Sequence, residues 1–498
     1  MYWLVGLLVA ETVLEGLICG GAAVTPTMRR VLCGALGLLL VGFTAALIVL
    51  DWQVWIWTIP FVLYRLINLL RVSAARMPAP QLRTVAVRAF GWLVAAQVLT
   101  VVVSGLATHF HIVTTIFDIG VALQLLCAVV LLRASTHTWR HAGLPADWKT
   151  LSDKELPSLS VLVPARNETE ELERCLQALT ASDYPKLEIL VLDDCSANRR
   201  TPEIIRSYAH AGVRFIQGGV PDESRWLAKN YAYAQLAHEA SGELLLFCGV
   251  DAGLEPQSMR ELVTLLQARN KDMLSVMPLR SQASGSSLLQ AMRYYWEICL
   301  PRRFFKRPPV LSTCWLIKRA ALERMGGFEA ISRSVNPEAP LARQAVVTDA
   351  YSFVRSDESL GIYSNKPAGE QYGTSVRVRY PQLHRRLELV ALVSLFELLF
   401  LLGPLIGLCF AARLTHTMAY VAVWCVALFC LLSTYALVAV GARLTTVWFG
   451  WLLMPVAFCI DLALLHISLW KYEFSTVDWK GRNVCIPVMQ VAPRPPKQ

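Results

Sequence analysis

The arrangement of long apolar stretches is the feature that most constrains what this chain can fold into. Five such stretches lie in its first part and three in its last part, each long enough to cross a hydrocarbon core of roughly 30 Å. They occupy residues 2–24, 31–50, 54–70, 89–106, 113–132, 387–411, 418–440 and 447–470. Between the two sets lie about 250 residues in which strand-like and helix-like segments alternate. The pattern predicts a multi-pass membrane protein with one large polar domain.

Composition supports the same class of protein. Hydrophobic residues make up 55% of the 498 residues and charged residues only 17%, which leaves too little polar surface for a soluble protein of this size. The formal net charge is +10, but no Lys/Arg run with interleaved aromatic residues occurs, and many basic residues flank apolar stretches. We therefore expect membrane lipid and not nucleic acid as a partner. The 13 cysteines are scattered without zinc-site spacing, so neither a disulfide framework nor a cysteine metal site is expected.

The loops between the first five apolar stretches differ in their arginine content. The loops at 51–53 and 107–112 contain no Lys or Arg, whereas those after the first, third and fifth stretches contain several. These are Arg29, Arg30, Arg71, Arg76, Arg83, Arg88, Arg133 and Arg140. Because basic loops stay in the cytoplasm, we expect the N-terminus outside and the polar domain in the cytoplasm.

The C-terminal stretches predict a less consistent topology. Three spans after a cytoplasmic domain place the tail outside, yet the tail at 471–498 is basic. The stretch at 387–411 is broken by Gly403-Pro404, so we expect part of it to be an interfacial helix and part a span. The predicted organisation is a transmembrane region at 1–144, a polar domain at 145–386, a second transmembrane region at 387–470, and a basic tail.

Two carboxylates, Glu11 and Glu15, lie one helical turn apart inside the first apolar stretch. One interpretation is an intramembrane site that faces a lipid or ion path. The other, which we favour, is that the segment lies partly at the membrane interface or packs its carboxylates inside the helix bundle.

Strand-like segments of the polar domain end in acidic residues. The apolar runs within 159–168 and 187–194 lead into polar loops, with a helix-like segment between them. Strand, helix and strand predict a parallel βαβ unit, and ligands bind at the carboxyl ends of such strands. Glu168, Asp193 and Asp194 are thereby placed to accept hydrogen bonds from a nucleotide base and ribose.

A third strand-like run, 242–251, ends at Asp251. A carboxylate at this position can hold a divalent cation against two phosphates, because Mg²⁺ and Mn²⁺ prefer oxygen ligands. A lone acid is more often a solvated loop end, but three strand ends in order within one domain favour a site.

Six motifs occur in order in the chain: Val163-Pro-Ala-Arg-Asn-Glu168, Leu192-Asp-Asp-Cys-Ser196, Arg225-Trp-Leu-Ala-Lys-Asn-Tyr-Ala232, Trp315-Leu-Ile-Lys-Arg319, Gly326-Gly327-Phe328 and Trp479-Lys-Gly-Arg482. Together they resemble membrane glycosyltransferases of family 2, nearest the hopanoid-associated, carotenoid and ceramide glucosyltransferase-like branch. The resemblance covers about residues 157–386 and extends into the final apolar stretches and the tail.

The resemblance implies an α/β GT-A domain inserted between transmembrane helices, a nucleotide-sugar donor and a lipid acceptor. It implies that Lys229 lies near the nucleotide. The residues expected to bind the donor are Pro164, Ala165, Arg166, Glu168, Asp193, Asp194, Lys229, Asn230, Val250 and Asp251.

The chain departs from the family at the metal motif, Asp-x-Asp. It has Gly249-Val250-Asp251 there, so only the second, metal-facing carboxylate remains. One carboxylate with diphosphate oxygens and water can still complete the shell of Mg²⁺ or Mn²⁺. We therefore expect Asp251 as the metal ligand, with weakened affinity, and metal-independent function stays an alternative.

The chain also departs at the catalytic-base motif, usually Glu-Asp, which here is Thr348-Asp349. Inverting transfer needs a carboxylate that takes the proton of the acceptor hydroxyl. By the resemblance Asp349 has that role, with Asp357 and Glu358 as the second choice.

A further family motif, Arg-Trp, is degenerate. Arg377 and Arg379 lie in this region, either to neutralise the leaving diphosphate or to face lipid phosphates.

The segment at 288–306 combines aromatic residues with a basic end. This pattern indicates an amphipathic helix at the membrane surface that places the acceptor pocket at the lipid boundary. A helix inside the domain with a basic end is the alternative.

The sequence therefore predicts a membrane-bound inverting glycosyltransferase that moves a sugar from a nucleotide-diphosphate donor, with UDP expected, to a lipid-borne hydroxyl. One alternative is a catalytically degenerate nucleotide-binding scaffold or transport component. A processive polysaccharide synthase is a weaker alternative, because the Arg-Trp motif and the C-terminal spans fit it poorly. The sequence predicts neither the sugar, the lipid nor the oligomeric state.

Overall fold

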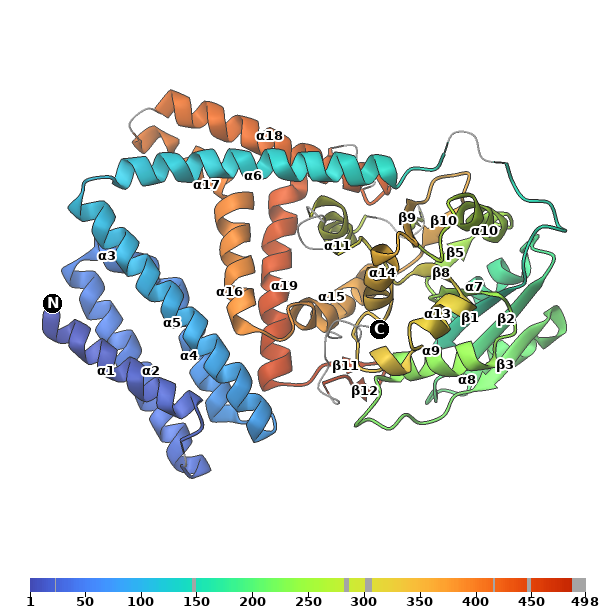
Figure 1. Cartoon of the computed structure of the whole chain (residues 1–498), viewed down its shortest axis with the longest axis horizontal. Coiled ribbons are helices and arrows are strands. Elements are labelled where there is room, and N and C mark those ends of the chain that lie inside the picture. The colour runs from blue at the N-terminus through green and yellow to red at the C-terminus, as the bar shows by residue number, and fades with distance from the viewer. Residues whose placement is uncertain are drawn as a thin grey trace. The chain divides into compact units, whose positions relative to one another are not determined.

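The computed structural model describes residues 1–22, 24–145, 149–281, 286–300, 307–414, 417–445 and 449–485. The chain forms two compact units, each built from segments far apart in the sequence (Figure 1). The first unit comprises residues 1–127, 383–428 and 462–476, and the second comprises 128–382, 429–461 and 477–498.

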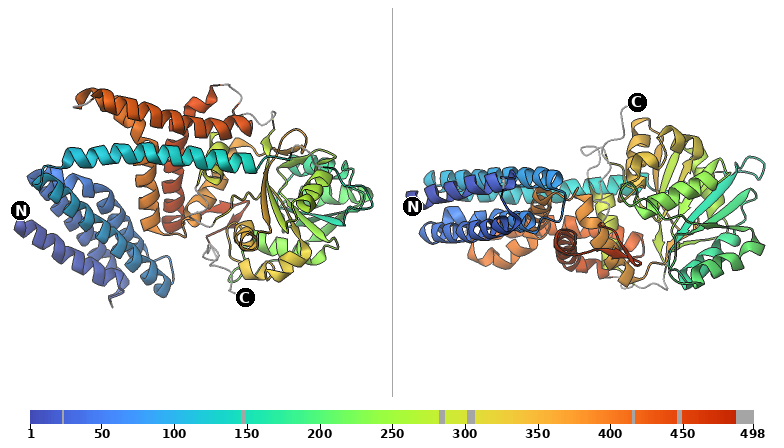
Figure 2. Two further views of the ribbon diagram at one scale, coloured as in Figure 1. Left: turned by 45° about the horizontal axis from the view of Figure 1, so that its top comes forward. Right: turned by 90° about the horizontal axis from the view of Figure 1, so that it is seen from below.

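Apolar helices, some of them long and some of them short segments, correspond to the predicted apolar stretches. Those in the N-terminal part are α1 (Tyr2–Cys19), α2 (Pro26–Leu50), α3 (Trp52–Trp55), η1 (Ile56–Thr58), α4 (Ile59–Ala74), α5 (Ala79–His109) and α6 (Val113–His141). Those in the C-terminal part are α16 (Leu387–Phe396), η5 (Glu397–Leu401), α17 (Gly403–Phe410), η6 (Ala411–Arg413), α18 (Thr417–Gly441), η7 (Gly450–Leu453) and α19 (Met454–Phe474). Helices α1, α2, α4 and α5 lie side by side in the first unit (Figure 2).

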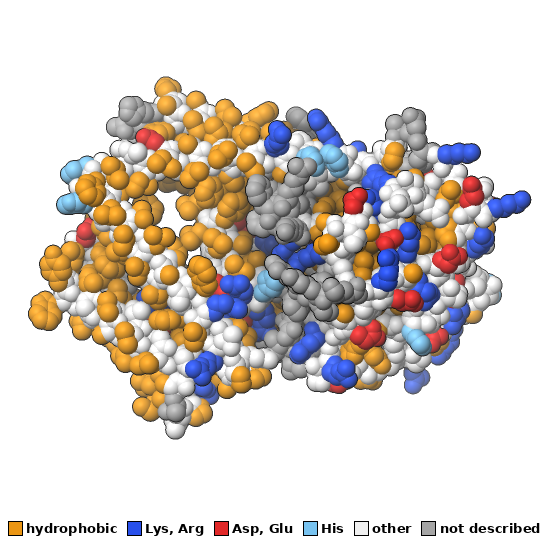
Figure 3. Space-filling view, viewed as in Figure 1, with side chains coloured by type: hydrophobic (Ala, Val, Ile, Leu, Met, Phe, Trp, Pro, Cys, Tyr) orange, Lys and Arg blue, Asp and Glu red, His pale blue; other side chains and the backbone are white. Residues whose placement is uncertain are grey.

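Within the described residues, seven helices are long and apolar enough to cross a membrane. A bent pair, Leu387–Leu401 and Gly403–Arg413, passes the same test together and bends by 49°. The break occurs at Gly403-Pro404, as predicted, because proline cannot donate a helical hydrogen bond and so begins a new helix. On the face drawn in Figure 3, hydrophobic side chains cover the long helices of the first unit, as expected of surfaces that contact lipid.

The carboxylates of Glu11 and Glu15 pack inside the helix bundle, which confirms the favoured interpretation. Both side chains are buried, and both accept hydrogen bonds from the guanidinium of Arg65 on α4. Arg65 Nη2 lies 2.5 Å from Glu15 Oε2 and 3.1 Å from Glu11 Oε2, while Arg65 Nη1 donates to Gln97 Oε1 at 2.7 Å. One buried cation thus connects α1, α4 and α5.

A seven-stranded sheet forms the centre of the second unit, in the order β3-β2-β1-β4-β8-β6-β9. The strands are β1 (Leu159–Ala165), β2 (Leu187–Asp193), β3 (Val213–Gln217), β4 (Leu244–Cys248), β6 (Met273–Met277), β8 (Cys314–Lys318) and β9 (Tyr351–Arg355). Strand β8 runs antiparallel to β4 and β6, and the other pairs are parallel. Continuous apolar runs such as Leu244–Cys248 form these strands because helices cover both faces of a mostly parallel sheet.

Helices and smaller sheets complete the second unit (Figure 1). The helices are α7 (Glu170–Thr180), α8 (Arg200–Ser207), η2 (Ala209–Ala211), α9 (Ala228–Glu239), α10 (Ser258–Ala268), α11 (Leu288–Cys299), α13 (Arg319–Arg324), η4 (Glu329–Ile331), α14 (Glu338–Val347) and α15 (Ala368–Gln382). A three-stranded sheet contains β5 (Ala252–Leu254), β10 (Ile362–Ser364) and β7 (Leu279–Arg280), and a hairpin contains β11 (Asp478–Trp479) and β12 (Arg482–Asn483). The predicted βαβ unit is confirmed as β1-α7-β2, with acidic residues in the first turn of α7, where the helix dipole favours them.

The segment predicted as an amphipathic surface helix at 288–306 begins as α11. The aromatic rings of Tyr294 and Tyr295 are buried, and Tyr295 packs edge-on against Phe458 at 5.3 Å between ring centroids. The described part is therefore packed within the second unit. Residues 301–306, which carry most of the predicted basic end, lie outside the described residues. Contact of this segment with a membrane stays a prediction.

Candidate active site

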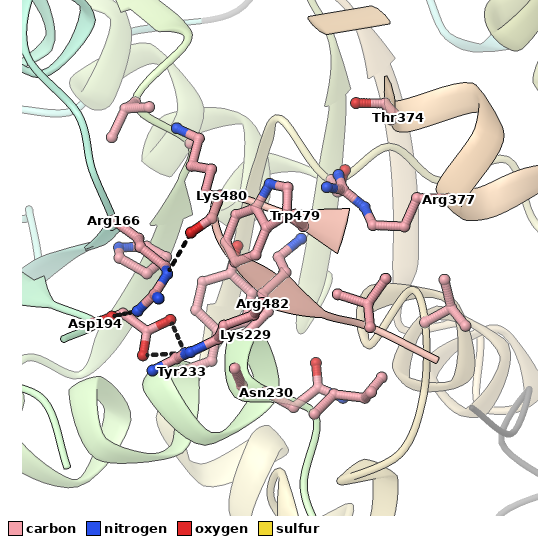
Figure 4. A pocket seen from close by; sticks show the side chains of 18 of the residues that line it. Arg166, Asp194, Lys229, Asn230, Tyr233, Thr374, Arg377, Trp479, Lys480 and Arg482 are labelled. Atoms are coloured by element: carbon pink, nitrogen blue, oxygen red, sulfur yellow. Dashed lines mark hydrogen bonds and ion pairs between the residues drawn. The ribbon is translucent and has the colours of Figure 1, made fainter. Parts of the chain in front are cut away.

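A pocket lies at the carboxyl ends of β1, β2 and β4 (Figure 4). Nine of the ten residues predicted to bind the donor line it: Pro164, Ala165, Arg166, Glu168, Asp194, Lys229, Asn230, Val250 and Asp251. The parallel register explains why they converge, since Ala165 pairs with Asp193 and Leu162 with Phe247. The loops that follow these strands therefore meet at one edge of the sheet.

The tenth residue, Asp193, has a local role. Its side chain is 3% exposed, and its Oδ1 accepts a hydrogen bond from Ser196 N at 3.1 Å. Arg166 stabilises the same loop, because its Nη1 donates to Asp194 O at 2.6 Å and to Cys195 O at 2.7 Å. Together these bonds fix the loop that carries the Asp194 carboxylate.

The C-terminal hairpin β11-β12 provides cations to the two predicted nucleoside-binding carboxylates. Lys480 Nζ donates to Glu168 Oε1, and Arg482 Nη1 donates to Asp194 Oδ1 and Oδ2 at 2.8 and 2.7 Å. The turn requires Gly481, whose φ of +80° is unfavourable for other residues. Lys480 and Arg482 were not among the predicted donor-binding residues, although the motif Trp479-Lys-Gly-Arg482 had marked this segment.

The hairpin also changes the electrostatics of the pocket. Burial raises the pKa of the Asp194 carboxyl, and Arg482 opposes that rise. Burial likewise raises the pKa of Glu168, with Lys480 opposing. Each tail cation therefore favours the ionised form of a carboxylate that its surroundings would otherwise tend to protonate.

Lys229 and Asn230 lie at the start of α9. The ammonium of Lys229 lies over the ring of Tyr233, 5.2 Å from its centroid, and burial lowers the pKa of this lysine while Glu338 opposes that fall. Glu338 is 1% exposed and lies at the start of α14, and it was not among the site residues predicted from the sequence. Asn230 Nδ2 donates to three carbonyl oxygens, those of Ile331, Ser332 and Ser334, so its side chain orders the segment before α14.

The side chain of Asp251 lies beside a lysine. Lys366 Nζ is 4.0 Å from Asp251 Oδ2, and both line the pocket. On the other side is Gly249, where a Cβ atom would overlap Asp251 Oδ1. Within the described part of the chain, no three His, Cys, Asp or Glu side chains form a group able to hold a metal ion. A lone carboxylate next to an ammonium is a poor match for Mg²⁺ or Mn²⁺, which takes about six oxygen ligands.

Arg377 and Arg379 have different surroundings, although both lie on α15. Arg377 lines the pocket, with its guanidinium 5.3 Å from the ring centroid of Trp479. Arg379 Nη2 donates to Asp461 Oδ2 at 2.5 Å, and Arg379 is not among the residues that line the pocket. Of the two, only Arg377 lines the pocket.

The predicted base, Asp349, does not lie with the other site residues. It precedes β9, which runs parallel to β6, so it lies at the edge of the sheet opposite the carboxyl ends of β1, β2 and β4. Its carboxylate is 96% exposed and 3.0 Å from Lys271 Nζ. The second choices also make other contacts: Asp357 Oδ1 accepts from Ser359 N and Leu360 N, and Glu358 pairs with Arg443. The placement of Asp349 thus corrects the motif-based expectation that it lies in the site.

An Asp349→Asn protein is therefore expected to retain its donor affinity and transfer rate within about twofold, whereas loss of a true base costs 10²–10⁴ in rate. The measurement is the rate of nucleoside diphosphate release, with Asp251→Asn as the matched variant inside the pocket. A large loss of rate in Asp349→Asn with unchanged donor binding would restore Asp349 as the base.

The sheet order, with a pocket at the strand ends, is that of a GT-A-like α/β domain. Residues 160–326 match Glycosyl transferase family 2. These residues therefore form a glycosyltransferase domain of family 2 within the polar domain.

Several known proteins are similar to this chain. Glycosyltransferase AglE of Haloferax volcanii is 25% identical over 233 residues, which cover 46% of this chain and 74% of AglE. The probable glycosyltransferase YdaM of Bacillus subtilis is 26% identical over 189 residues, 35% of this chain and 44% of YdaM. The 4,4'-diaponeurosporenoate glycosyltransferase of Staphylococcus haemolyticus is 30% identical over 125 residues, 24% of this chain and 32% of that protein. The latter two are thus matched over less than half of their own length.

Among solved structures, mannosyltransferase PcManGT from Pyrobaculum calidifontis, in complex with GDP-Man and Mn²⁺, matches with a TM-score of 0.42 and 17% identity. The match covers 71% of this chain and 97% of that protein.

Proposed function

We propose that this chain is a membrane-bound inverting glycosyltransferase that moves a sugar from a nucleotide-diphosphate donor, with UDP expected, to a lipid-borne hydroxyl. The observation that carries the proposal is the pocket at the carboxyl ends of β1, β2 and β4, where carboxylates and cations from separate segments converge. The family 2 domain supports sugar transfer from a nucleotide donor. The seven apolar helices support a membrane location, where a lipid acceptor is available.

The proposed donor pose follows the charge distribution of the pocket. Glu168 and Asp194, oriented by the tail cations, accept hydrogen bonds from the nucleoside hydroxyl and base N–H groups. Lys229 and Arg377 face the diphosphate, where fixed cations stabilise the charge that develops as the sugar departs. No metal step is included, because Asp251 is accompanied by Gly249 and Lys366 rather than by a second carboxylate.

The acceptor hydroxyl still needs a carboxylate to take its proton. Asp251 and Glu370 line the pocket and replace Asp349 as the candidates for this role. Apart from the base and the absence of a metal step, the proposed chemistry is that expected from the sequence.

A nucleotide-binding scaffold or transport component is the second candidate function. Two observations favour it: the metal motif has lost a carboxylate, and the aligned base, Asp349, lies outside the pocket. In this case the domain binds nucleotide but does not release a sugar from it.

The experiment that separates the two functions is nucleoside diphosphate release by the purified chain with a panel of UDP- and GDP-sugars, lipid extract, and either Mn²⁺ or EDTA. The proposed enzyme releases nucleoside diphosphate from at least one donor only when the lipid extract is present. Measurable nucleotide binding without release from any donor would establish the scaffold instead.

A further inference from the structure

The peptide that follows β10 holds Lys366 at the strand end that carries Asp251. Strands β5 and β10 are antiparallel, with Ser364 paired to Ala252. The ladder continues one residue further, because Asn365 N donates to Asp251 O at 2.7 Å. Lys366 comes next, and its carbonyl oxygen accepts a hydrogen bond at 3.2 Å from Arg280, which is 1% exposed. The position of Lys366 is therefore set by backbone pairing and a buried arginine.

The backbone turn at Gly249 brings the Asp251 side chain close to the position where the metal motif lacks its first carboxylate. Gly249 and Ala252 form a tight turn, in which Ala252 N donates to Gly249 O at 3.0 Å. The Asp251 carboxylate folds back over Gly249 and occupies space that a side chain at position 249 would need. An aspartate at position 249 would therefore require the Asp251 carboxylate to move from its observed position.

Charge on this side of the pocket is positive. The charged groups that act on Lys366 are two arginines, Arg377 and Arg293, and two carboxylates, Asp251 and Glu370, so with Lys366 itself there is an excess of one positive charge. The Lys366 side chain is only 16% exposed, so its ammonium lies in a site that excludes much of the water.

We propose that the Lys366 ammonium, held at Asp251, provides the positive charge that a divalent cation provides in transferases with two metal-binding carboxylates. This inference rests on the proposed function. In the transfer, the bond between the sugar C1 and the diphosphate oxygen breaks and its electron pair stays on that oxygen, next to Lys366. The acceptor oxygen forms the new bond to C1, and its proton passes to a carboxylate of the pocket. The chain therefore binds its donor without added Mg²⁺ or Mn²⁺.

The test is the dissociation constant of UDP, and separately of GDP, for the purified full-length chain in EDTA and in Mn²⁺. Of the two nucleotides, we consider the one that the unmodified chain binds more tightly. We expect its dissociation constants in EDTA and in Mn²⁺ to differ by less than about twofold. Lys366→Met should weaken binding in EDTA by about tenfold or more, the effect of losing a charge-assisted hydrogen bond. Lys366→Arg retains the charge and should stay within about threefold of the unmodified chain.

Lys318→Met is the matched control, because Lys318 pairs with Asp272 at 2.9 Å at the other edge of the sheet. Its nucleotide affinity should be unchanged. Two outcomes overturn the inference alone: binding that Mn²⁺ strengthens tenfold or more in the unmodified chain, or a Lys366→Met protein that binds nucleotide normally in EDTA. Absence of nucleotide binding under every condition would instead contradict the proposed function itself.

Discussion

Replacing Arg65 with methionine is expected to lower the free energy of unfolding by about 3–5 kcal/mol, the cost of leaving buried charges without their partner. The guanidinium of Arg65 bonds both Glu11 and Glu15, and all three side chains are at most 2% exposed. The second carboxylate oxygens, Glu11 Oε1 and Glu15 Oε1, have no hydrogen-bond partner among the described residues. Arg65 is therefore the main source of compensation for two buried carboxylates.

The measurement is denaturant titration in detergent micelles, followed by tryptophan fluorescence. Arg30→Met is the matched control, because Arg30 is exposed, and it should change the free energy by less than about 0.5 kcal/mol. The triple variant Glu11→Gln, Glu15→Gln, Arg65→Met should recover much of the loss, since it removes the unpaired charges. Equal stability of Arg65→Met and the unmodified chain would show that the cluster does not hold the helices together.

An Arg482→Ala protein is expected to bind its nucleotide donor about 10- to 100-fold more weakly. The substitution leaves the Asp194 carboxylate, 3% exposed, without the guanidinium that bonds both of its oxygens. Burial then raises the pKa of Asp194 further, so the carboxyl loses acceptor strength for the nucleoside. The substitution also removes one positive charge from a pocket that is to hold a diphosphate.

Nucleotide affinity of the purified chain is the appropriate measurement, with Arg200→Ala as the control. Arg200 is 61% exposed on α8, so its removal should leave affinity unchanged. Tighter binding by Arg482→Ala would mean that the hairpin competes with the nucleotide, and equal binding would mean that the hairpin lies outside the donor site. Either result contradicts the assignment of the tail to the pocket.

The pocket at the strand ends was largely predictable because local sequence determines it. Apolar runs that end in polar loops predicted β1, β2 and β4, and parallel pairing necessarily brings such loops to one edge. Glu168, Asp194 and the residues around them therefore converge as expected. The helix break at Gly403-Pro404 was predictable for a similar reason, since proline acts on its own helix.

Other features of the fold and of the site were not predictable, because they depend on contacts between segments far apart in the chain. The Lys480 ammonium meets Glu168 across 312 residues, and no local pattern specifies that return. Asp349 matched a motif by spacing, but the strand that follows it starts at the opposite edge of the sheet. The partner of Glu11 and Glu15 lies on α4, and the sequence predicted only that these carboxylates are packed.

Following the sugar itself shows whether this chain transfers it from a nucleotide to a lipid. The purified chain is incubated with lipid extract and nucleotide donors that carry a radiolabel in the sugar, and label is counted in the organic phase. We predict label in a lipid product, strong reduction of that label in Lys229→Met, and none when the extract is omitted. If every donor leaves the organic phase unlabelled while the unmodified chain binds nucleotide, the account of this chain as a lipid glycosyltransferase is contradicted.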